Sequence, residues 1–312
     1  MPIFKNAFRL HRQVGIGVLL FITSLAGLPT ASLAACAFYQ SSVNQAMQAK
    51  DLETLEELLV TLNMQSDCRV AYLEWVKRRM AQIVAARADG LVQQGGDLVV
   101  AETWLKRAPT VIWVTQVVHG DIAARRRQWQ AAASFYNQAL DLIADTQTTP
   151  QAPAPAVIQK VYQLASEAQV LANNLEVTVS RSGEASGMMR SSMRGFIPVT
   201  RIVPIRFKYG KMALSEKGKK SARQLARYLK RRNLASVTLI GHTDSKGSHT
   251  VNDRISKERA RAVKNQLRKL GISAKIRATG KGKRKPLKLA NRAIYTQAEI
   301  DALNRRVEFV TK

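Results

Sequence analysis

A short strand, a turn-rich loop and a helix follow one another near the C-terminal end of the chain, and this stretch constrains the fold most. The run 237–241 is apolar and β-branched and ends in glycine, as a buried strand does. The next residues are rich in Gly, Asp, Ser and Asn, which favour turns. Apolar residues then recur at helical spacing, with Ser256 as the candidate N-cap. This order predicts Asp244 just beyond the strand and Arg259 in the first turn of the helix. A carboxylate and a guanidinium placed in this way can flank one small zwitterionic ligand.

These residues resemble the OmpA-like peptidoglycan-binding domain. The family pattern is Gly-His-Thr-Asp-x-x-Gly followed by Asn-x-x-Leu-Ser-x-x-Arg-Ala, and residues 241–247 and 252–260 follow it closely. Further stretches resemble the opening strand of the family, its Gly-x-Gly…Pro loop and its closing strand: 206–214, 280–286 and 304–308. The resemblance covers about the last third of the chain, with its motifs in the family order.

The resemblance implies a pocket for the diaminopimelate side chain of the peptidoglycan stem peptide. Asp244 and Arg259 would hold the amino and carboxylate groups of that ligand. The other pocket residues implied by the resemblance are Thr243, Asn252, Ile255, Arg305 and Arg306. The chain departs from the family where Gly210 replaces a frequent acid, Val251 an aromatic residue and Ile255 a leucine. These departures change the expected shape of the pocket. They leave Asp244 and Arg259 intact, and we call these two residues the clamp.

Positive charge is concentrated in the same third of the chain. The whole protein has a formal net charge of +27, and residues 201–312 hold 31 Lys and Arg against 7 Asp and Glu. Such a balance favours a polyanionic partner, which could be nucleic acid, anionic lipid or an anionic polymer of the envelope. A solvated basic surface with no partner explains any single cluster equally well.

The N-terminus is typical of a secretory signal peptide, predicted over residues 1–35. Basic residues precede an apolar run at 14–28, which is shorter than a membrane span, and small residues follow it. Export makes nucleic acid an unexpected partner. It places the protein in the periplasm or at the periplasmic face of the outer membrane, with which it could associate.

The chain has two cysteines, Cys36 and Cys68, and Cys36 allows two interpretations. Residues 33–36 resemble a lipobox, which would make Cys36 a lipidated N-terminus. Alternatively, the two cysteines of an exported protein form one disulfide. We expect the disulfide, because a helical pattern begins directly after Cys36 without a polar tether.

Residues 36–176 are predicted to form an all-α domain, followed by a Ser-, Gly- and Met-rich linker at 177–198. Gly120, Trp129 and Tyr136 lie in a pattern that resembles a tetratricopeptide repeat, which implies a protein partner for this domain. A generic helical bundle with these aromatic residues in its core fits the same pattern. We expect the helical domain and the basic domain to fold independently.

Residues 199–312 are predicted to form an α+β domain with the order β-α-β-α-β-β and its helices packed on a mixed sheet. No role can be assigned to the insert 287–303. His242 and His249 have no acidic or cysteine partner at metal-ligand spacing, and Ser245 has no base placed by a motif. We therefore expect no metal, no cofactor and no catalytic residues.

The sequence thus predicts an envelope protein that binds peptidoglycan non-covalently and anchors itself or a complex to the cell wall. Two alternatives remain at this point. The protein could be a structural part of a secretion or motility machine, or a general polyanion-binding module. The spacing of Asp244 and Arg259 by itself is equally compatible with a structural ion pair.

Overall fold

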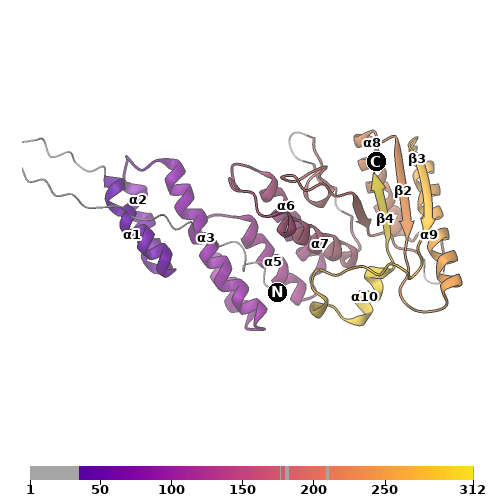
Figure 1. Ribbon diagram of the computed structural model, residues 1–312, viewed down its shortest axis with the longest axis horizontal. Helices are drawn as coiled ribbons and strands as arrows, with labels where there is room; N and C mark the ends of the chain where they lie inside the picture. The colour runs from indigo at the N-terminus through magenta and orange to yellow at the C-terminus, as the bar shows by residue number, and fades with distance from the viewer. Residues whose placement is uncertain (1–34, 176, 180–182, 209–210, 312) are drawn as a thin grey trace, which may run out of the picture. The chain divides into compact units, whose positions relative to one another are not determined.

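The computed structural model describes residues 35–175, 177–179, 183–208 and 211–311 (Figure 1). Residues 1–34, which include nearly all of the predicted signal peptide, and Gly210 lie outside this range. The chain divides into two compact units, Met1–Thr115 and Gln116–Lys312. The two units are described separately below.

The first unit is helical. Its helices are α1 (Ala35–Ala49), α2 (Leu52–Met64), α3 (Val70–Gln93) and α4 (Leu98–Lys106), and α5 (Trp113–Arg125) begins within it. Asp51 caps α2 by accepting a hydrogen bond from the backbone N–H of Thr54. Leu52, Leu55 and Leu62 recur at helical spacing and are fully buried, as the pattern predicts.

A disulfide joins Cys36 in α1 to Cys68, which lies just before α3, and the two Cα atoms are 5.1 Å apart. The backbone N–H of Cys36 also donates a hydrogen bond to Asp67 at 3.0 Å. The start of α1 is therefore held against the α2–α3 connection by a covalent bond and a hydrogen bond.

The second unit begins within α5, and α6 (Trp129–Ala144) follows. Gly120 of α5 lies against the ring of Tyr136, so closely that a Cβ atom at this position would come within 2.4 Å of the ring. The hydroxyl of Tyr136 donates a hydrogen bond to Asp121 at 2.6 Å. Only glycine fits at this contact. The contact therefore explains why Gly120 and Tyr136 occur together in the predicted repeat pattern. The tetratricopeptide resemblance itself stays a prediction.

A mixed four-stranded sheet follows α7 (Pro155–Ala172) and has the strand order β1-β4-β2-β3. The strands are β1 (Thr200–Val203), β2 (Ser236–Gly241), β3 (Lys275–Gly280) and β4 (Val307–Thr311). β2 pairs with β3 in parallel, while β4 is antiparallel to both β1 and β2. The predicted α+β class with a mixed sheet is confirmed.

Helices α8 (Glu216–Arg232) and α9 (His249–Lys269) cover one face of the sheet. Tyr228 of α8 packs edge-on against Phe309 of β4, with ring centroids 5.9 Å apart.

On β1, Ile202 points away from this face because side chains alternate along a strand. Ile202 belongs to a buried cluster with Val170 of α7 and Leu303 of α10 (Gln297–Asn304). Near β1, therefore, helices pack on both faces of the sheet. The sequence patterns predict no helix on the face that Ile202 occupies.

The insert 287–303 supplies much of that second layer. It contains η3 (Arg292–Ile294) and most of α10, so the observed order is β-α-β-α-β-α-β with one helix more than predicted. Tyr295 from the insert donates a hydrogen bond to the fully buried Glu167 of α7 at 2.7 Å. The insert thus holds α7 against the sheet through this hydrogen bond.

The described part of segment 177–198 is packed rather than extended. It contains η2 (Gly187–Met189), and the side chains of Met188, Met189 and Met193 are buried. The backbone N–H groups of Gly187 and Met188 donate hydrogen bonds to side chains of α6 at 2.7 and 2.8 Å. Both α6 and α7 belong to the same compact unit as the sheet. The boundary between the two compact units therefore lies about sixty residues before the predicted linker. Independent folding of residues 199–312 stays a prediction.

Among the described helices, none combines the length and the apolar character that crossing a membrane requires.

Candidate functional site

The loop between β2 and α9 begins the site, and its helix starts earlier than the sequence predicts. Ser248 is the N-cap of α9 and accepts a hydrogen bond from the backbone N–H of Val251 at 3.3 Å. The predicted cap, Ser256, lies inside the helix and is fully buried. Arg259 therefore lies in the third turn of α9, well away from the positive end of the helix dipole.

Ser256 holds the Gly-x-Gly loop against α9. Its hydroxyl accepts a hydrogen bond from the backbone N–H of Gly282 at 3.0 Å and donates one to the carbonyl of Asp253. Gly282 has a positive φ of 52°, and a Cβ atom there would lie 2.6 Å from the carboxylate of Asp253. The left-handed backbone conformation therefore favours glycine at this position.

Asp244 lies at the carboxyl end of β2, as predicted, and its partner is Arg305. The Nη1 atom of Arg305 donates a hydrogen bond to Oδ2 of Asp244 at 2.7 Å, and the Asp244 side chain is largely buried. The second oxygen, Oδ1, accepts the backbone N–H of Lys246 at 3.3 Å. The carboxylate is therefore fixed in orientation before any ligand binds.

Arg259 reaches the same pocket from the neighbouring helix. Its guanidinium lies over the ring of Phe207, 5.1 Å from the centroid, where cation and ring attract each other. Its Nε atom is buried and has no hydrogen-bond partner. Burial, followed by the charge of Arg305, lowers the pKa of Arg259, but an arginine remains cationic at neutral pH. No described carboxylate forms an ion pair with it.

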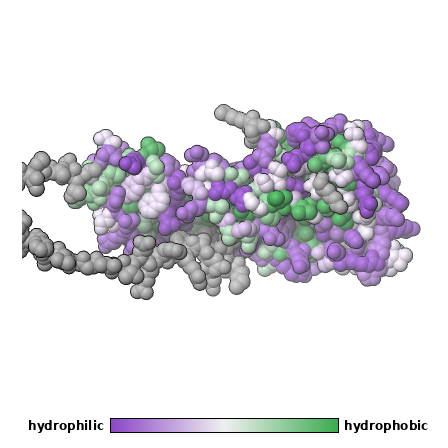
Figure 2. All heavy atoms as spheres, turned by 45° about the horizontal axis from the view of Figure 1, so that its top comes forward, coloured by the Kyte–Doolittle hydropathy of each residue, from purple (hydrophilic) through white to green (hydrophobic). Residues whose placement is uncertain are grey.

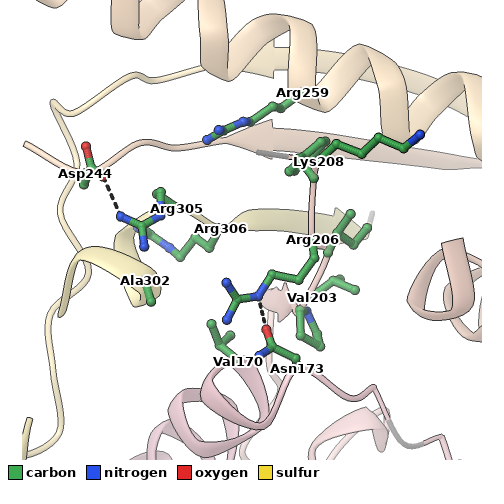
Figure 3. A pocket seen from close by; sticks show the side chains of 13 residues that line it. Val170, Asn173, Val203, Arg206, Lys208, Asp244, Arg259, Ala302, Arg305 and Arg306 are labelled. Carbon is green, nitrogen blue, oxygen red and sulfur yellow. Dashed lines mark hydrogen bonds and ion pairs between the residues drawn. The ribbon is translucent and has the colours of Figure 1, made fainter. Parts of the chain in front are cut away.

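Asp244 and Arg259 share one pocket of about 450 Å³ (Figure 3). Its lining comprises Val170, Asn173, Val203, Pro204, Ile205, Arg206, Phe207, Lys208, Asp244, Arg259, Ala302, Arg305 and Arg306. Of the seven predicted ligand-binding residues, the structure brings Asp244, Arg259 and the two consecutive arginines into this lining. Five of the lining side chains are cationic and one is a carboxylate, so the pocket favours anions.

Three predicted residues do not line the pocket, and two of them hold the loop beside it. The backbone N–H of Thr243 donates to the carbonyl of Gly282 at 3.1 Å. The amide of Asn252 is buried and donates to the carbonyls of Lys246 and Ser248 at 2.7 and 2.9 Å. These bonds hold the β2–α9 loop in shape. Ile255 lies half-buried on α9, outside the lining.

Arg306 lines the pocket but is tied to β4. It is buried, and its Nη2 atom lies 2.7 Å from a carboxylate oxygen of Glu308. The imidazole of His242, which is buried too, lies 3.2 Å from the other oxygen. Burial opposes the charged form of Glu308, but the contact with His242 and the charge of Arg306 outweigh it and lower the pKa to about 2. His242 therefore lies in a buried cluster with Arg306 and Glu308.

Sequence reasoning missed one wall of the pocket. Val170 and Asn173 come from the end of α7, and Ala302 comes from the insert helix α10. Arg206 and Lys208 belong to the predicted opening strand but were assigned no role. No motif marks α7 as part of the site, because the family resemblance begins only after it. Among the described residues, no three His, Cys, Asp or Glu side chains gather so that they could hold a metal ion.

Comparison with known proteins identifies a family domain that contains part of the site. Residues 206–297 match the family model described as OmpA family. The C-terminal region contains an OmpA-family domain. The matched residues of this domain include Asp244 and Arg259, whereas Arg305 and the α7 residues lie outside the match.

The OmpA-family domain has relatives among envelope proteins. The chain is 33% identical over 106 residues to outer membrane porin F of Pseudomonas aeruginosa, covering 33% of this chain and 29% of that protein. It is 38% identical over 106 residues to peptidoglycan-associated lipoprotein of Legionella pneumophila, covering 33% of this chain and 57% of that protein. The crystal structure of the peptidoglycan-associated lipoprotein from Burkholderia pseudomallei matches with 28% identity and a TM-score of 0.30, over 35% of this chain and 88% of that one. The chain thus spans less than two thirds of the length of either curated relative.

Proposed function

We propose that the OmpA-family domain binds peptidoglycan non-covalently and anchors an envelope protein to the cell wall. The observation that supports this most is the pairing of a fixed carboxylate, Asp244, with a separate cation, Arg259, in one pocket of about 450 Å³. Relatives of this domain include proteins named for their association with peptidoglycan. We propose a binding function without catalysis.

The ligand that fits this pocket chemically is the side chain of diaminopimelate. Its far end is a zwitterion, with one ammonium and one carboxylate on the same carbon. Asp244 offers an acceptor to the ammonium, and the guanidinium of Arg259 offers paired donors to the carboxylate. Because Arg259 has no carboxylate partner among the described residues, the ligand would supply the missing negative charge.

Arg305 and the ligand ammonium can share Asp244. A carboxylate accepts about four hydrogen bonds through its two oxygens, and from the described residues Asp244 accepts two, one from Arg305 and one from the backbone of Lys246. Arg305 therefore orients the carboxylate and leaves acceptor sites for a ligand.

The remaining assignments rest on the same proposal. We place the protein in the periplasm or at the periplasmic face of the outer membrane. The helices of the first unit would recruit a protein partner, and that partner could belong to a secretion or motility complex.

A second candidate function is binding to an anionic polymer through charge alone, and α8 favours it. Seven of its eight Lys and Arg residues are exposed: Lys217, Lys220, Arg223, Arg227, Lys230, Arg231 and Arg232. Hydrophilic residues cover most of the visible surface around α8 and α9 in Figure 2. The only acid of α8, Glu216, is paired with Lys219 at 2.7 Å. Such a surface attracts any polyanion at low salt.

Co-sedimentation with purified peptidoglycan sacculi at about 0.05 and about 0.5 M salt separates the two candidates, because screening suppresses interactions between exposed charges. The test compares wild type with Asp244→Ala and with the α8 triple variant Lys220→Gln, Arg223→Gln, Arg227→Gln. We expect the triple variant to lose binding mainly at low salt and Asp244→Ala to lose it at both. If only the triple variant matters, bulk charge explains the binding and the pocket does not.

A further inference from the structure

The end of α7 forms one wall of the pocket and orients an arginine there. Asn173 follows the last residue of α7 with a left-handed φ of 56°, and its side-chain carbonyl accepts a hydrogen bond from Nε of Arg206. Figure 3 shows the two side chains meeting at the edge of the pocket. This contact lies outside the clamp of Asp244 and Arg259.

The position of α7 is fixed by buried contacts. Val170 packs with Ile202 and Leu303 in one apolar cluster. Glu167, one turn earlier in the helix, accepts hydrogen bonds from the hydroxyl of Tyr295 at 2.7 Å and from the backbone N–H of Ala290 at 2.9 Å. A wall held in this way can position a side chain for ligand binding.

Arg206 adds a positive charge that the clamp does not use. No described carboxylate forms an ion pair with it. Partial burial, followed by the charge of Arg305, which lines the same pocket, lowers the pKa of Arg206. Lys208 also lines the pocket, but in Figure 3 its side chain extends away from the three guanidinium groups of Arg206, Arg259 and Arg305.

The charges of the pocket therefore do not balance for a simple zwitterion. Asp244 is paired with Arg305, and Arg306 is paired with Glu308. A bound zwitterion supplies one carboxylate, which Arg259 takes. Arg206 is then left without an anion, so the complete ligand should carry a second carboxylate near the first.

We propose that Arg206, oriented by Asn173 of α7, forms a second anion subsite that takes a main-chain carboxylate of the stem peptide. The inference rests on the proposed function and adds a ligand class, which is a peptide with at least one carboxylate besides that of the diaminopimelate side chain. Free diaminopimelate would fill the clamp and a longer acidic peptide would fill both parts of the site.

Two peptides test the subsite by isothermal titration calorimetry at about 0.15 M salt. One is L-Ala-γ-D-Glu-meso-diaminopimelate, and the other is the same peptide with its glutamyl and main-chain diaminopimelyl carboxylates amidated. We expect wild type to bind the acid peptide about five to ten times more tightly than the amidated one, the range for one exposed charge-assisted hydrogen bond. Arg206→Gln should bind both peptides equally, at the affinity of wild type for the amidated one.

Two further variants sharpen the result. Asn173→Gly removes the hydrogen-bond acceptor but keeps a residue that tolerates the left-handed backbone, and it should reduce the preference for the acid peptide about threefold. Lys211→Gln removes an exposed cation of the same segment that does not line the pocket, and it should keep the full preference. Circular dichroism confirms that each variant is folded.

The outcomes separate the subsite from the clamp. A folded Arg206→Gln protein that keeps the wild-type preference for the acid peptide overturns the subsite, and the Arg206–Asn173 contact is then structural only. If wild type binds neither peptide, the proposed function fails and the subsite fails with it.

Discussion

Arg305 pairs with Asp244 across the pocket, with 2.7 Å between Nη1 and Oδ2. The sequence predicted both residues for the site but expected Asp244 and Arg259 to act together. In the structure, α10 brings Arg305 to the carboxylate, and Arg259 remains beside Phe207. The carboxylate of the clamp is therefore oriented by a residue that follows the insert.

Replacing Arg305 tests that orienting role. We expect Arg305→Ala to weaken binding of a diaminopimelate peptide about three- to tenfold, because Asp244 loses a charge-assisted hydrogen bond that fixes its rotamer. Thermal stability should change little, since partly exposed ion pairs contribute about 0–1 kcal/mol. Arg292→Gln also removes one positive charge, from an exposed residue of the insert, and is the matched control for the titration. Tighter binding by Arg305→Ala would show that Arg305 competes with the ligand instead.

The buried carboxylate of Glu167 should stabilise the attachment of α7 to the sheet. Glu167→Ala leaves the donors of Tyr295 and Ala290 without an acceptor, and we expect a loss of about 2–4 kcal/mol in the free energy of unfolding. Tyr295→Phe removes one donor and should cost about 1–2 kcal/mol. Urea denaturation measures both, and the double variant should lose less than the sum because the two residues share one contact. Additive losses would mean that the two side chains act separately.

Glu308 should make the second unit sensitive to acid. Its pKa is about 2 in the folded protein against an ordinary value of 4.5, so the folded state binds this proton more weakly than the unfolded state. The stabilisation is present above pH 4.5 and is lost as the pH falls from about 4.5 towards 2, by about 3 kcal/mol. Thermal melts over this range should show a shallower loss in Glu308→Gln than in wild type. Asp145→Asn, which removes an exposed carboxylate of the same unit, should keep the wild-type slope, and an equal slope in Glu308→Gln would refute the assignment.

Local patterns predicted those parts of the fold that local chemistry determines. The strand that ends at Gly241, the position of Asp244 beyond it and the mixed sheet all follow from alternation, turn residues and motif order. The start of α9 was placed too late, because Ser256 fits an N-cap pattern while its hydroxyl in fact binds the Gly-x-Gly loop. Two serines at plausible cap positions cannot be distinguished without the loop that only one of them contacts.

The sequence patterns do not predict contacts between segments that are far apart in the chain. The wall formed by Val170 and Asn173 depends on how α7 packs on β1 and α10, and apolar periodicity does not name the partner of a helix face. The pairing of Arg305 with Asp244 depends on α10, a helix that falls in the insert without assigned structure. Buried Met188 and Met193 likewise show that a Ser-, Gly- and Met-rich composition does not by itself exclude packing.

The disulfide between Cys36 and Cys68 should survive in the mature protein. Intact-mass analysis of protein extracted from membranes, before and after reduction and alkylation, should show two alkylated cysteines only after reduction. We expect the double variant Cys36→Ser, Cys68→Ser to lose about 2–4 kcal/mol of stability, because the bridge closes a loop with a sequence separation of 32. A diacylglycerol mass on Cys36 would contradict the disulfide and support lipidation.

The clamp of Asp244 and Arg259 is the central claim, and calorimetric titration with a diaminopimelate-containing peptide at about 0.15 M salt tests it most directly. We expect Asp244→Ala and Arg259→Ala each to cost about 2–4 kcal/mol of binding free energy, because each removes one side of a charge pair with the ligand. The double variant should lose less than the sum, since both residues act on one ligand. Folded single variants that bind the peptide with wild-type affinity would contradict the account.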